Sequence, residues 1–259
     1  MEVFEDVHGN LPREGPGNRS CTQRALALAA DTVPPDARVL DIACGPGMQT
    51  LDLATWLPSA TIDAVDWHPS YVAEAKRRVA AAGLSERIAV SRADMRALPF
   101  EPLSFDLIWC EGAAYIMGVE EALLAWHPLL KRGGVLAFSE AVWLRDDPPA
   151  DLLDFWTHGY PDMSDVEHCR ELVANCGYRL VGDFVLPQAA WWDDYYFPME
   201  ERIKSLVSKY DGDSLSMHAP NECQREIDLY RSFADFYGYV FVVALAGEPA
   251  MPVSGRPTK

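Results

Sequence analysis

The chain of 259 residues lacks the features that would place it in a membrane or outside the cell. No apolar run approaches the ~20 residues that a membrane-spanning helix needs. The acidic start, MEVFEDVHGN, has no apolar core of the kind found in signal peptides. The six cysteines are scattered, which favours free thiols in a reducing compartment over a disulfide framework. We therefore expect a cytoplasmic protein that does not enter membranes.

Basic residues are also scarce. The sequence has 22 Lys and Arg against 39 Asp and Glu, which gives a formal net charge of −17. The densest basic stretch, residues 76–78, lies on an expected helix face. A chain this acidic is repelled by nucleic acids and anionic membrane surfaces. We expect neither as a partner.

Strand and helix signals alternate along the first part of the chain, and no internal repeat interrupts them. Helices are expected at 20–33, 48–57, 69–83, 119–133 and 164–177. Buried strands are expected at 37–43, 61–67, 87–95, 105–112 and 134–144, followed by 178–186 and 238–247. This alternation predicts an α/β, doubly wound, Rossmann-like sheet of seven mostly parallel strands. The last strand is expected to be antiparallel, with a helical insertion before it.

The same signals divide the chain into five parts. Residues 1–20 are rich in Gly, Pro and charge and read as a mobile arm, which we expect to become ordered when a cofactor binds. Residues 21–186 form the core, 187–237 a helical insertion over the active site, and 238–247 the final strand of the core. Residues 248–259 read as a flexible tail.

Helix ends carry local signals of their own. Ser20 followed by Gln23 fits a capping box, and Ser164 is expected to cap the helix that it opens. The helix at 119–133 has basic residues in its expected last turn, which suits the helix dipole.

The stretch VLDIACGPGMQT, residues 39–50, combines a buried strand, a glycine turn and a helix start. Met48 and Gln49 stand where a phosphate-binding loop needs Lys and Ser or Thr. Thr50 stands where the dinucleotide fingerprint needs Gly or Ala. Asp41 at the strand end would repel a pyrophosphate and attract a ligand that carries an ammonium group.

Five motifs in order then resemble the class I S-adenosylmethionine-dependent methyltransferases. They are VLDIACGPG, IDAVDWHP, IAVSRADMRALPF, FDLIWCEGAAYIMG and LLKRGGVLAFSE, spread over residues 37–143. The resemblance implies S-adenosylmethionine as cofactor and S-adenosylhomocysteine as product. The layout of the second half, with FWTHGYPDM and WWDDYYFPME, is similar to a bacterial group of small-molecule methyltransferases.

The resemblance also implies a role for individual residues around the cofactor. The methionine end would be held by Asp41, by the backbone of Ala43, Gly45 and Gly47, and by Gln49. The ribose hydroxyls would be accepted by Asp66, with Trp67 near the adenine. The adenine amino group would be accepted by Asp94, with Met95 beside it, and Glu111 would pass under the methionyl moiety. Many members have Gly where this chain has Ala43, so we expect a negative φ there. Taken singly, each aspartate could instead be a helix cap or turn residue.

The sequence says less about which residues bind the methyl acceptor. We hypothesise that Glu140 or His158 acts as a base or orients the substrate, with Tyr115 and Tyr160 lining the pocket. A histidine in such a place is more often an ordinary polar contact than a base. The many carboxylates slightly favour an amine among N-, O- and S-nucleophiles.

Two other features of the second half read as structural. Trp191 and Trp192, in an aromatic run that could form a lid, are more often core residues than a cage. Cys169 and Cys176 lie seven positions apart on one helix, which is not a zinc spacing, so we expect no metal.

Three function classes remain in competition. The leading one is a small-molecule methyltransferase that acts by in-line displacement at the sulfonium methyl group. An RNA or protein methyltransferase is disfavoured by the charge and by Cys110-Glu111-Gly112-Ala113, where an Asn-Pro-Pro-Tyr motif would stand. A non-catalytic binder of the same cofactor is the third. The oligomeric state stays open, a homodimer included.

Overall fold

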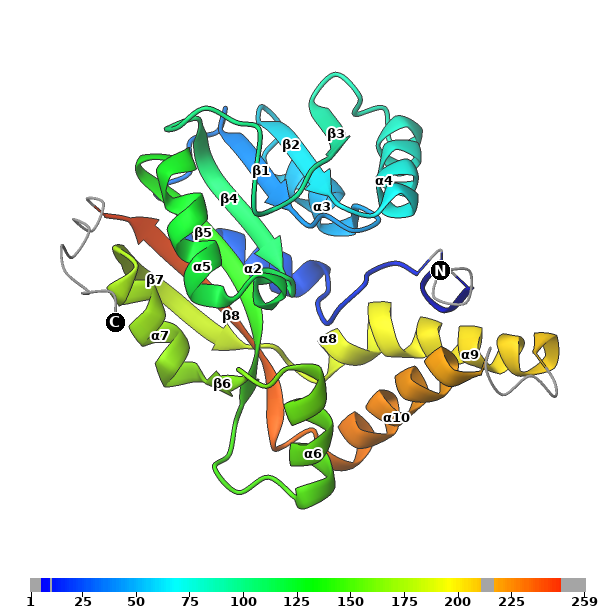
Figure 1. Ribbon diagram of the computed structural model, residues 1–259. Helices are drawn as coiled ribbons and strands as arrows, with labels where there is room; N and C mark the ends of the chain where they lie inside the picture. The colour runs from blue at the N-terminus through cyan, green and yellow to red at the C-terminus, as the bar shows by residue number, and fades with distance from the viewer. Residues whose placement is uncertain (1–5, 10, 211–216, 248–259) are drawn as a thin grey trace, which may run out of the picture.

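One twisted sheet organises the protein in the computed structural model, which describes residues 6–9, 11–210 and 217–247 (Figure 1). Its strands lie in the order β3-β2-β1-β4-β5-β8-β7, and the short β6 pairs with β5. The strands are β1 (Arg38–Ile42), β2 (Thr61–Asp66), β3 (Ile88–Arg92), β4 (Phe105–Glu111), β5 (Leu130–Trp143), β6 (Ser164–Asp165), β7 (Tyr178–Val185) and β8 (Tyr237–Ala246). β8 runs antiparallel to both β5 and β7, while the other pairs are parallel. The predicted fold class is confirmed.

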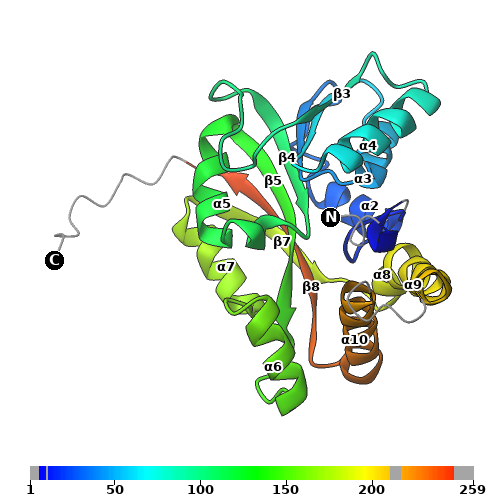
Figure 2. The ribbon, with the colours of Figure 1, turned by 45° about the vertical axis from the view of Figure 1, so that its right-hand side comes forward.

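Helices cover both faces of the sheet, as the parallel strands require (Figure 2). On one face lie α2 (Arg19–Leu28), α3 (Met48–Trp56) and α4 (Pro69–Ala81). On the other lie α5 (Val119–Trp126) and α7 (Val166–Asn175), while α6 (Ala150–Gly159) follows β5. Side chains of β1 alternate between the two layers: Val39 belongs to the first, and Leu40 and Ile42 belong to the second.

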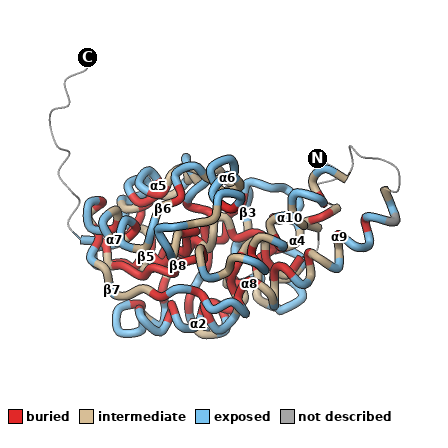
Figure 3. Tube along the Cα trace, turned by 90° about the horizontal axis from the view of Figure 1, so that it is seen from below, coloured by how far each residue is buried: buried red, intermediate tan, exposed pale blue. Residues whose placement is uncertain are grey.

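A helical insertion separates β7 from β8. It consists of α8 (Ala189–Trp191), the single π-helical turn η3 (Trp192–Tyr196), α9 (Phe197–Lys209) and α10 (His218–Phe233). Trp191 is 1% exposed, and its ring stacks on that of Tyr230 with centroids 4.1 Å apart. Trp191 is therefore a core residue, as expected, and Trp192 is half-buried. In Figure 3 the buried segments run through the middle of the molecule, with exposed residues on the outer turns of the helices.

Several helix ends differ from the sequence predictions. Asn18, not Ser20, caps α2, because its side chain accepts a hydrogen bond from the backbone N–H of Cys21. Asp165, not Ser164, caps α7, because its side chain accepts a hydrogen bond from the backbone N–H of His168.

The helix expected at 119–133 is shorter than predicted. It ends at Trp126, and a 3-10 turn, η2 (His127–Leu129), follows before β5 begins at Leu130. Pro128 explains the early end, because proline lacks an N–H and its ring clashes with the preceding helical turn. The basic residues predicted for the last helical turn therefore lie at the start of β5.

The described part of the N-terminal arm packs against both the core and the insertion. Leu11 is buried, and the guanidinium of Arg78 donates hydrogen bonds to the carbonyls of Leu11 and Pro12. The backbone N–H of Gly17 donates to the carbonyl of Ala190 at 2.8 Å. Residues 1–5 and 10 of the expected arm, and the expected tail at 248–259, lie outside the described residues.

Candidate functional site

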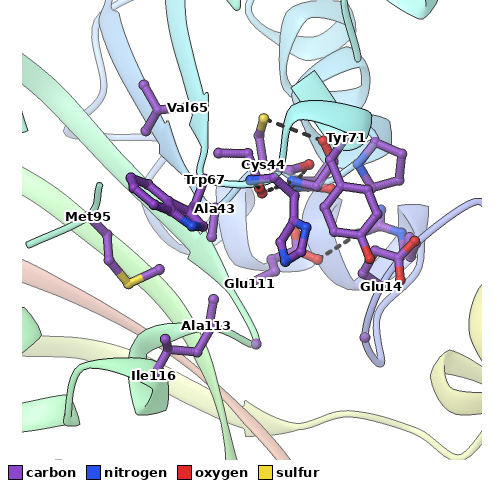
Figure 4. A pocket seen from close by; sticks show the side chains of 18 of the residues that line it. Glu14, Ala43, Cys44, Val65, Trp67, Tyr71, Met95, Glu111, Ala113 and Ile116 are labelled. Carbon is purple, nitrogen blue, oxygen red and sulfur yellow. Dashed lines mark hydrogen bonds and ion pairs between the residues drawn. The ribbon is translucent and has the colours of Figure 1, made fainter. Parts of the chain in front are cut away.

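A cavity of about 640 Å³ opens at the carboxyl ends of β1, β2 and β4 (Figure 4). It lies where the chain leaves β1 in one direction for β2 and β3 and later returns on the other side for β4. Ligands of open α/β sheets bind at this kind of switch point. The walls come from the turn after β1, the segments after β2, β3 and β4, and the N-terminal arm.

The turn after β1 has an unusual backbone. Ala43, Gly45 and Gly47 have φ values of 54°, 53° and 87°. The expectation of a negative φ at Ala43 is therefore wrong, and the left-handed conformation there costs an L-residue roughly 1–2 kcal/mol. Gly47 also permits close helix packing, because a Cβ there would lie 3.1 Å from the Cβ of Ala75. Ala43 and Gly45 line the cavity, whereas Gly47 does not.

Asp41 lies behind this turn. Its side chain is 0% exposed, is absent from the cavity wall, and accepts a hydrogen bond from the hydroxyl of Thr50 at 2.5 Å. Burial raises the pKa of Asp41 to about 7. The structure thus places Asp41 as a support of the strand–turn–helix unit, at one remove from any ligand in the cavity.

Asp66, the last residue of β2, and Trp67, which follows it, lie on the cavity wall. The two carboxylate oxygens of Asp66 accept hydrogen bonds from the backbone N–H groups of Gly45 at 2.9 Å and His68 at 2.8 Å. Burial raises the pKa of Asp66, and these N–H groups oppose the rise. Trp67 is 57% exposed, with the guanidinium carbon of Arg92 4.4 Å from its ring centroid.

Three further predicted residues reach the cavity from other elements. Asp94 and Met95 follow β3, and one oxygen of Asp94 accepts from the N–H of Arg96 at 2.9 Å. Gln49 in α3 lines the cavity while its amide donates to the carbonyl of Cys44 at 2.9 Å. Residues far apart in the sequence are therefore brought to one wall, as the motifs predicted.

Glu111, at the end of β4, meets a partner that sequence reasoning missed. Its Oε2 accepts from Nη1 of Arg13 at 2.6 Å, and its Oε1 accepts from the hydroxyl of Thr22 and the indole of Trp109. A Cβ on Gly17 would lie 2.8 Å from Oε2 of Glu111. That glycine was the available signal, since it marks a close approach.

The arm supplies five of the residues that line the cavity. They are His8, Arg13, Glu14, Gly15 and Pro16. The sequence of the arm has neither helical nor strand periodicity, so it did not predict that these residues line the cavity. Arg13 is 4% exposed and also contacts Asp52 at 3.3 Å.

The residues predicted for the acceptor end divide into two groups. Tyr115 lines the cavity, and its ring contacts that of Tyr160, with centroids 5.2 Å apart. Glu140 lies behind them and is 1% exposed; burial raises the pKa of both phenols, and Glu140 adds to the rise when it is ionised. His158 does not line the cavity. Its side chain is 79% exposed, and its Nδ1 lies 2.8 Å from the carbonyl oxygen of Asp154.

Glu140 is unusual for a carboxyl group in a central strand. Its Oε1 accepts from the N–H of Ala141 at 2.9 Å, while its buried Oε2 has no partner of normal hydrogen-bond geometry among the described residues. Burial raises the pKa of Glu140 to about 8. The group is therefore mostly protonated at neutral pH.

Comparison with known proteins identifies this arrangement. Residues 39–134 match the family model described as a methyltransferase domain. The match covers the strand–turn–helix unit and the following strands, up to the start of β5. A methyltransferase from Geobacter sulfurreducens, solved with S-adenosyl-L-homocysteine, aligns with a TM-score of 0.78 at 20% identity over 96% of this chain and 98% of its own. The predicted resemblance to class I methyltransferases is confirmed at the level of domain and fold.

Two further similar proteins are matched over only part of their own length. Phosphoethanolamine N-methyltransferase 2 from Haemonchus contortus, solved with S-adenosyl-L-methionine, aligns with a TM-score of 0.67 at 18% identity. The alignment covers 95% of this chain and 56% of that one. An uncharacterised protein of Haemophilus influenzae is 30% identical over 155 residues, which are 57% of this chain and 61% of that protein. This match thus spans less than two thirds of the relative.

Proposed function

We propose that this protein transfers a methyl group from S-adenosylmethionine to a small-molecule acceptor (EC 2.1.1). The observation that carries the proposal is the cavity of about 640 Å³, which joins a glycine turn to carboxylates at the carboxyl ends of β2 and β4 and just after β3. Its volume falls within the roughly 300–1,000 Å³ of small-molecule sites. A methyltransferase domain provides the fold.

The residues present fit this cofactor. Asp66 would accept the ribose hydroxyls, and Asp94 the adenine amino group, with Trp67 and Met95 near the adenine. The turn at Ala43 and Gly45 would lie along the methionyl chain. The cofactor supplies an activated methyl group, and the chain's own task is to align an acceptor with it, which is catalysis by proximity and orientation.

Several features favour an amine as the acceptor. The leaving thioether is neutral, so the site has no anion to stabilise, while an ammonium acceptor must be bound and deprotonated. Four carboxylates, Glu14, Asp66, Asp94 and Glu111, line the cavity with only two arginines, Arg13 and Arg96, and such an acidic excess attracts cations. A protein of the same fold is named for methylating an amine. Tyr115 would contact the acceptor, and Glu140 would act behind it as a positioning residue.

Calorimetry with S-adenosylmethionine, S-adenosylhomocysteine and NAD tests the cofactor. We expect both sulfur ligands to bind wild type, and Asp66→Asn to weaken both. The control is Asp36→Asn, an exposed residue before β1 and therefore at the opposite edge of the sheet. Tighter binding of NAD, or no binding of either sulfur ligand, would overturn the proposal.

A second assay tests the acceptor. Release of S-adenosylhomocysteine is measured with panels of amines, phenols and thiols, and separately with bulk RNA and with unfolded protein. We expect turnover with members of the amine panel. Turnover only with RNA or protein would establish the alternative acceptor class, and binding without turnover on any panel would indicate a non-catalytic binder.

A further inference from the structure

The π-helical turn of the insertion, η3, is an irregularity beside the cavity. A hydrogen bond from the backbone N–H of Phe197 to the carbonyl of Trp192 closes it across five residues. Such single turns are rare, and within helices they are frequent at functional sites. The turn follows Ala190, whose carbonyl accepts from the N–H of Gly17 in the arm. It therefore lies next to a segment that forms part of the cavity wall.

The extra residue of this turn decides which side chain faces the cavity. In an α-helix, residues four apart share a face, so Tyr195 would lie against Trp191 in the core of the insertion. Tyr196 takes that place instead: it is 0% exposed, and its ring centroid lies 5.5 Å from those of Trp191 and Tyr230. Tyr195 lines the cavity, and among the described residues it is the only one of the insertion that does so.

Tyr195 offers a ligand an aromatic face. Its ring stacks on that of Tyr196, with centroids 4.9 Å apart and 26° between the planes, so the opposite face is the one available to the cavity. Burial raises the pKa of the Tyr195 phenol well above its ordinary value, and Glu226 of α10 is a further cause. The phenol therefore stays protonated at neutral pH and does not serve as a base, which leaves it a binding role.

Tyr195 and Tyr115 belong to the end of the cavity that the proposed cofactor leaves free. The proposed function places adenine and ribose against the segments at the ends of β2 and β3, and the methionyl chain along the turn after β1. Tyr239 packs behind the remaining end. A Cβ on Gly112 would lie 3.3 Å from its Cε1, and its ring centroid lies 5.3 Å from that of Trp191. Tyr239 thus joins the segment that carries Tyr115 to the insertion that carries Tyr195.

The carboxylates near this end are already paired or lie behind the wall. Glu111 accepts from Nη1 of Arg13 at 2.6 Å, and Oε2 of Glu14 lies 2.7 Å from Nδ1 of His8. Glu140 does not line the cavity. The acidic wall attracts a cation into the cavity, but the groups that the cation meets at this end are aromatic rings. The negative face of an aromatic ring attracts a cation directly.

We infer that the ring faces of Tyr195 and Tyr115 bind the ammonium group of the acceptor and select cationic acceptors over neutral molecules of the same shape. The inference rests on the proposed function, because it names the residues that choose its acceptor. A carboxylate holds an ammonium group through its N–H bonds, whereas an aromatic face needs none. The same wall therefore also binds a nitrogen that already carries methyl groups.

The test is calorimetry on protein saturated with S-adenosylhomocysteine, so that the cofactor part of the cavity is filled. The probes are benzylamine, which is a cation at neutral pH, benzyltrimethylammonium, which is a cation without N–H bonds, and the neutral benzyl alcohol. Wild type should bind both cations more tightly than the alcohol. Tyr195→Leu should reduce this preference by about 2- to 30-fold, the range expected for one cation–π contact. Tyr195→Phe keeps the ring and should retain the preference.

Phe197→Leu is the matched control, because it removes a ring of the same insertion that is 54% exposed and does not line the cavity. It should change none of the three affinities. If Tyr195→Leu does not fold, Tyr115→Leu decides, since Tyr115 is 39% exposed and lies outside the insertion.

Three results would refute the inference: a wild type without preference for the cations, equal losses for the cations and the alcohol, or a loss in Tyr195→Phe as large as in Tyr195→Leu. The affinity for S-adenosylhomocysteine itself should stay within about twofold of wild type in each variant. If wild type does not bind S-adenosylhomocysteine, the proposed function fails instead.

Discussion

The buried carboxyl of Glu140 should make the stability of this protein fall as the pH rises. Glu140 is 1% exposed in β5, and burial raises its pKa from 4.5 to about 8. In the unfolded chain the same group is in water and titrates near its ordinary value. Between these two pKa values the unfolded chain releases a proton that the folded protein retains. The unfolded state then binds fewer protons, so the free energy of unfolding decreases with pH.

The size of this effect follows from the two pKa values. Each unit of pKa difference corresponds to about 1.36 kcal/mol, so Glu140 should lower the free energy of unfolding by about 3 kcal/mol between pH 5.5 and pH 8. Above pH 8 both states lose the proton, and the decrease stops. Glu140→Gln has nearly the same shape but no titration, so it should lack this component.

Urea unfolding at several pH values between 5.5 and 8 measures the difference. We expect the free energies of wild type and Glu140→Gln to diverge by about 3 kcal/mol across this range, with the variant more stable at high pH. Asp41 also has a raised pKa, but it is present in both proteins, so its contribution cancels. Glu86→Gln, which alters an exposed carboxyl after α4, should run parallel to wild type. If Glu140→Gln also runs parallel, Glu140 is ionised in the folded protein and the reasoning is wrong.

Three further predictions concern single residues. Ala43→Gly should raise the free energy of unfolding by up to about 1 kcal/mol, because the relief at φ 54° exceeds the added flexibility of the unfolded chain; destabilisation in a urea titration would contradict it. Trp191→Ala should lower the free energy of unfolding by about 3–5 kcal/mol in the same urea titration, while Trp67→Ala, at an exposed position, should lower it far less. Equal decreases would contradict the assignment of Trp191 to the core. His158→Ala should leave kcat/KM within about twofold of wild type once an acceptor is known, and a tenfold loss would restore its candidacy as a base.

Local signals were sufficient for the sheet and for most of the cavity wall. Each strand and helix around the cofactor motifs carries its own hydrophobic pattern, and parallel strands bring their carboxyl ends to one edge. Asp66, Asp94 and Glu111 therefore share a cavity as predicted. The helix predicted at 119–133 was too long because its hydrophobic pattern continues past Pro128 into β5.

The sequence by itself thus determined the order of the helices and strands and the strand–turn–helix motif at residues 39–50. Tertiary structure decided which charged groups reach the cavity. Asp41 ends a strand as the motif suggests, yet its side chain packs under Thr50 and does not line the cavity. Arg13 and Glu14 come from a segment without periodicity and become part of the wall because Glu111, Asp52 and the glycine turn hold them there. Such contacts join residues up to 98 positions apart, and no local pattern records them.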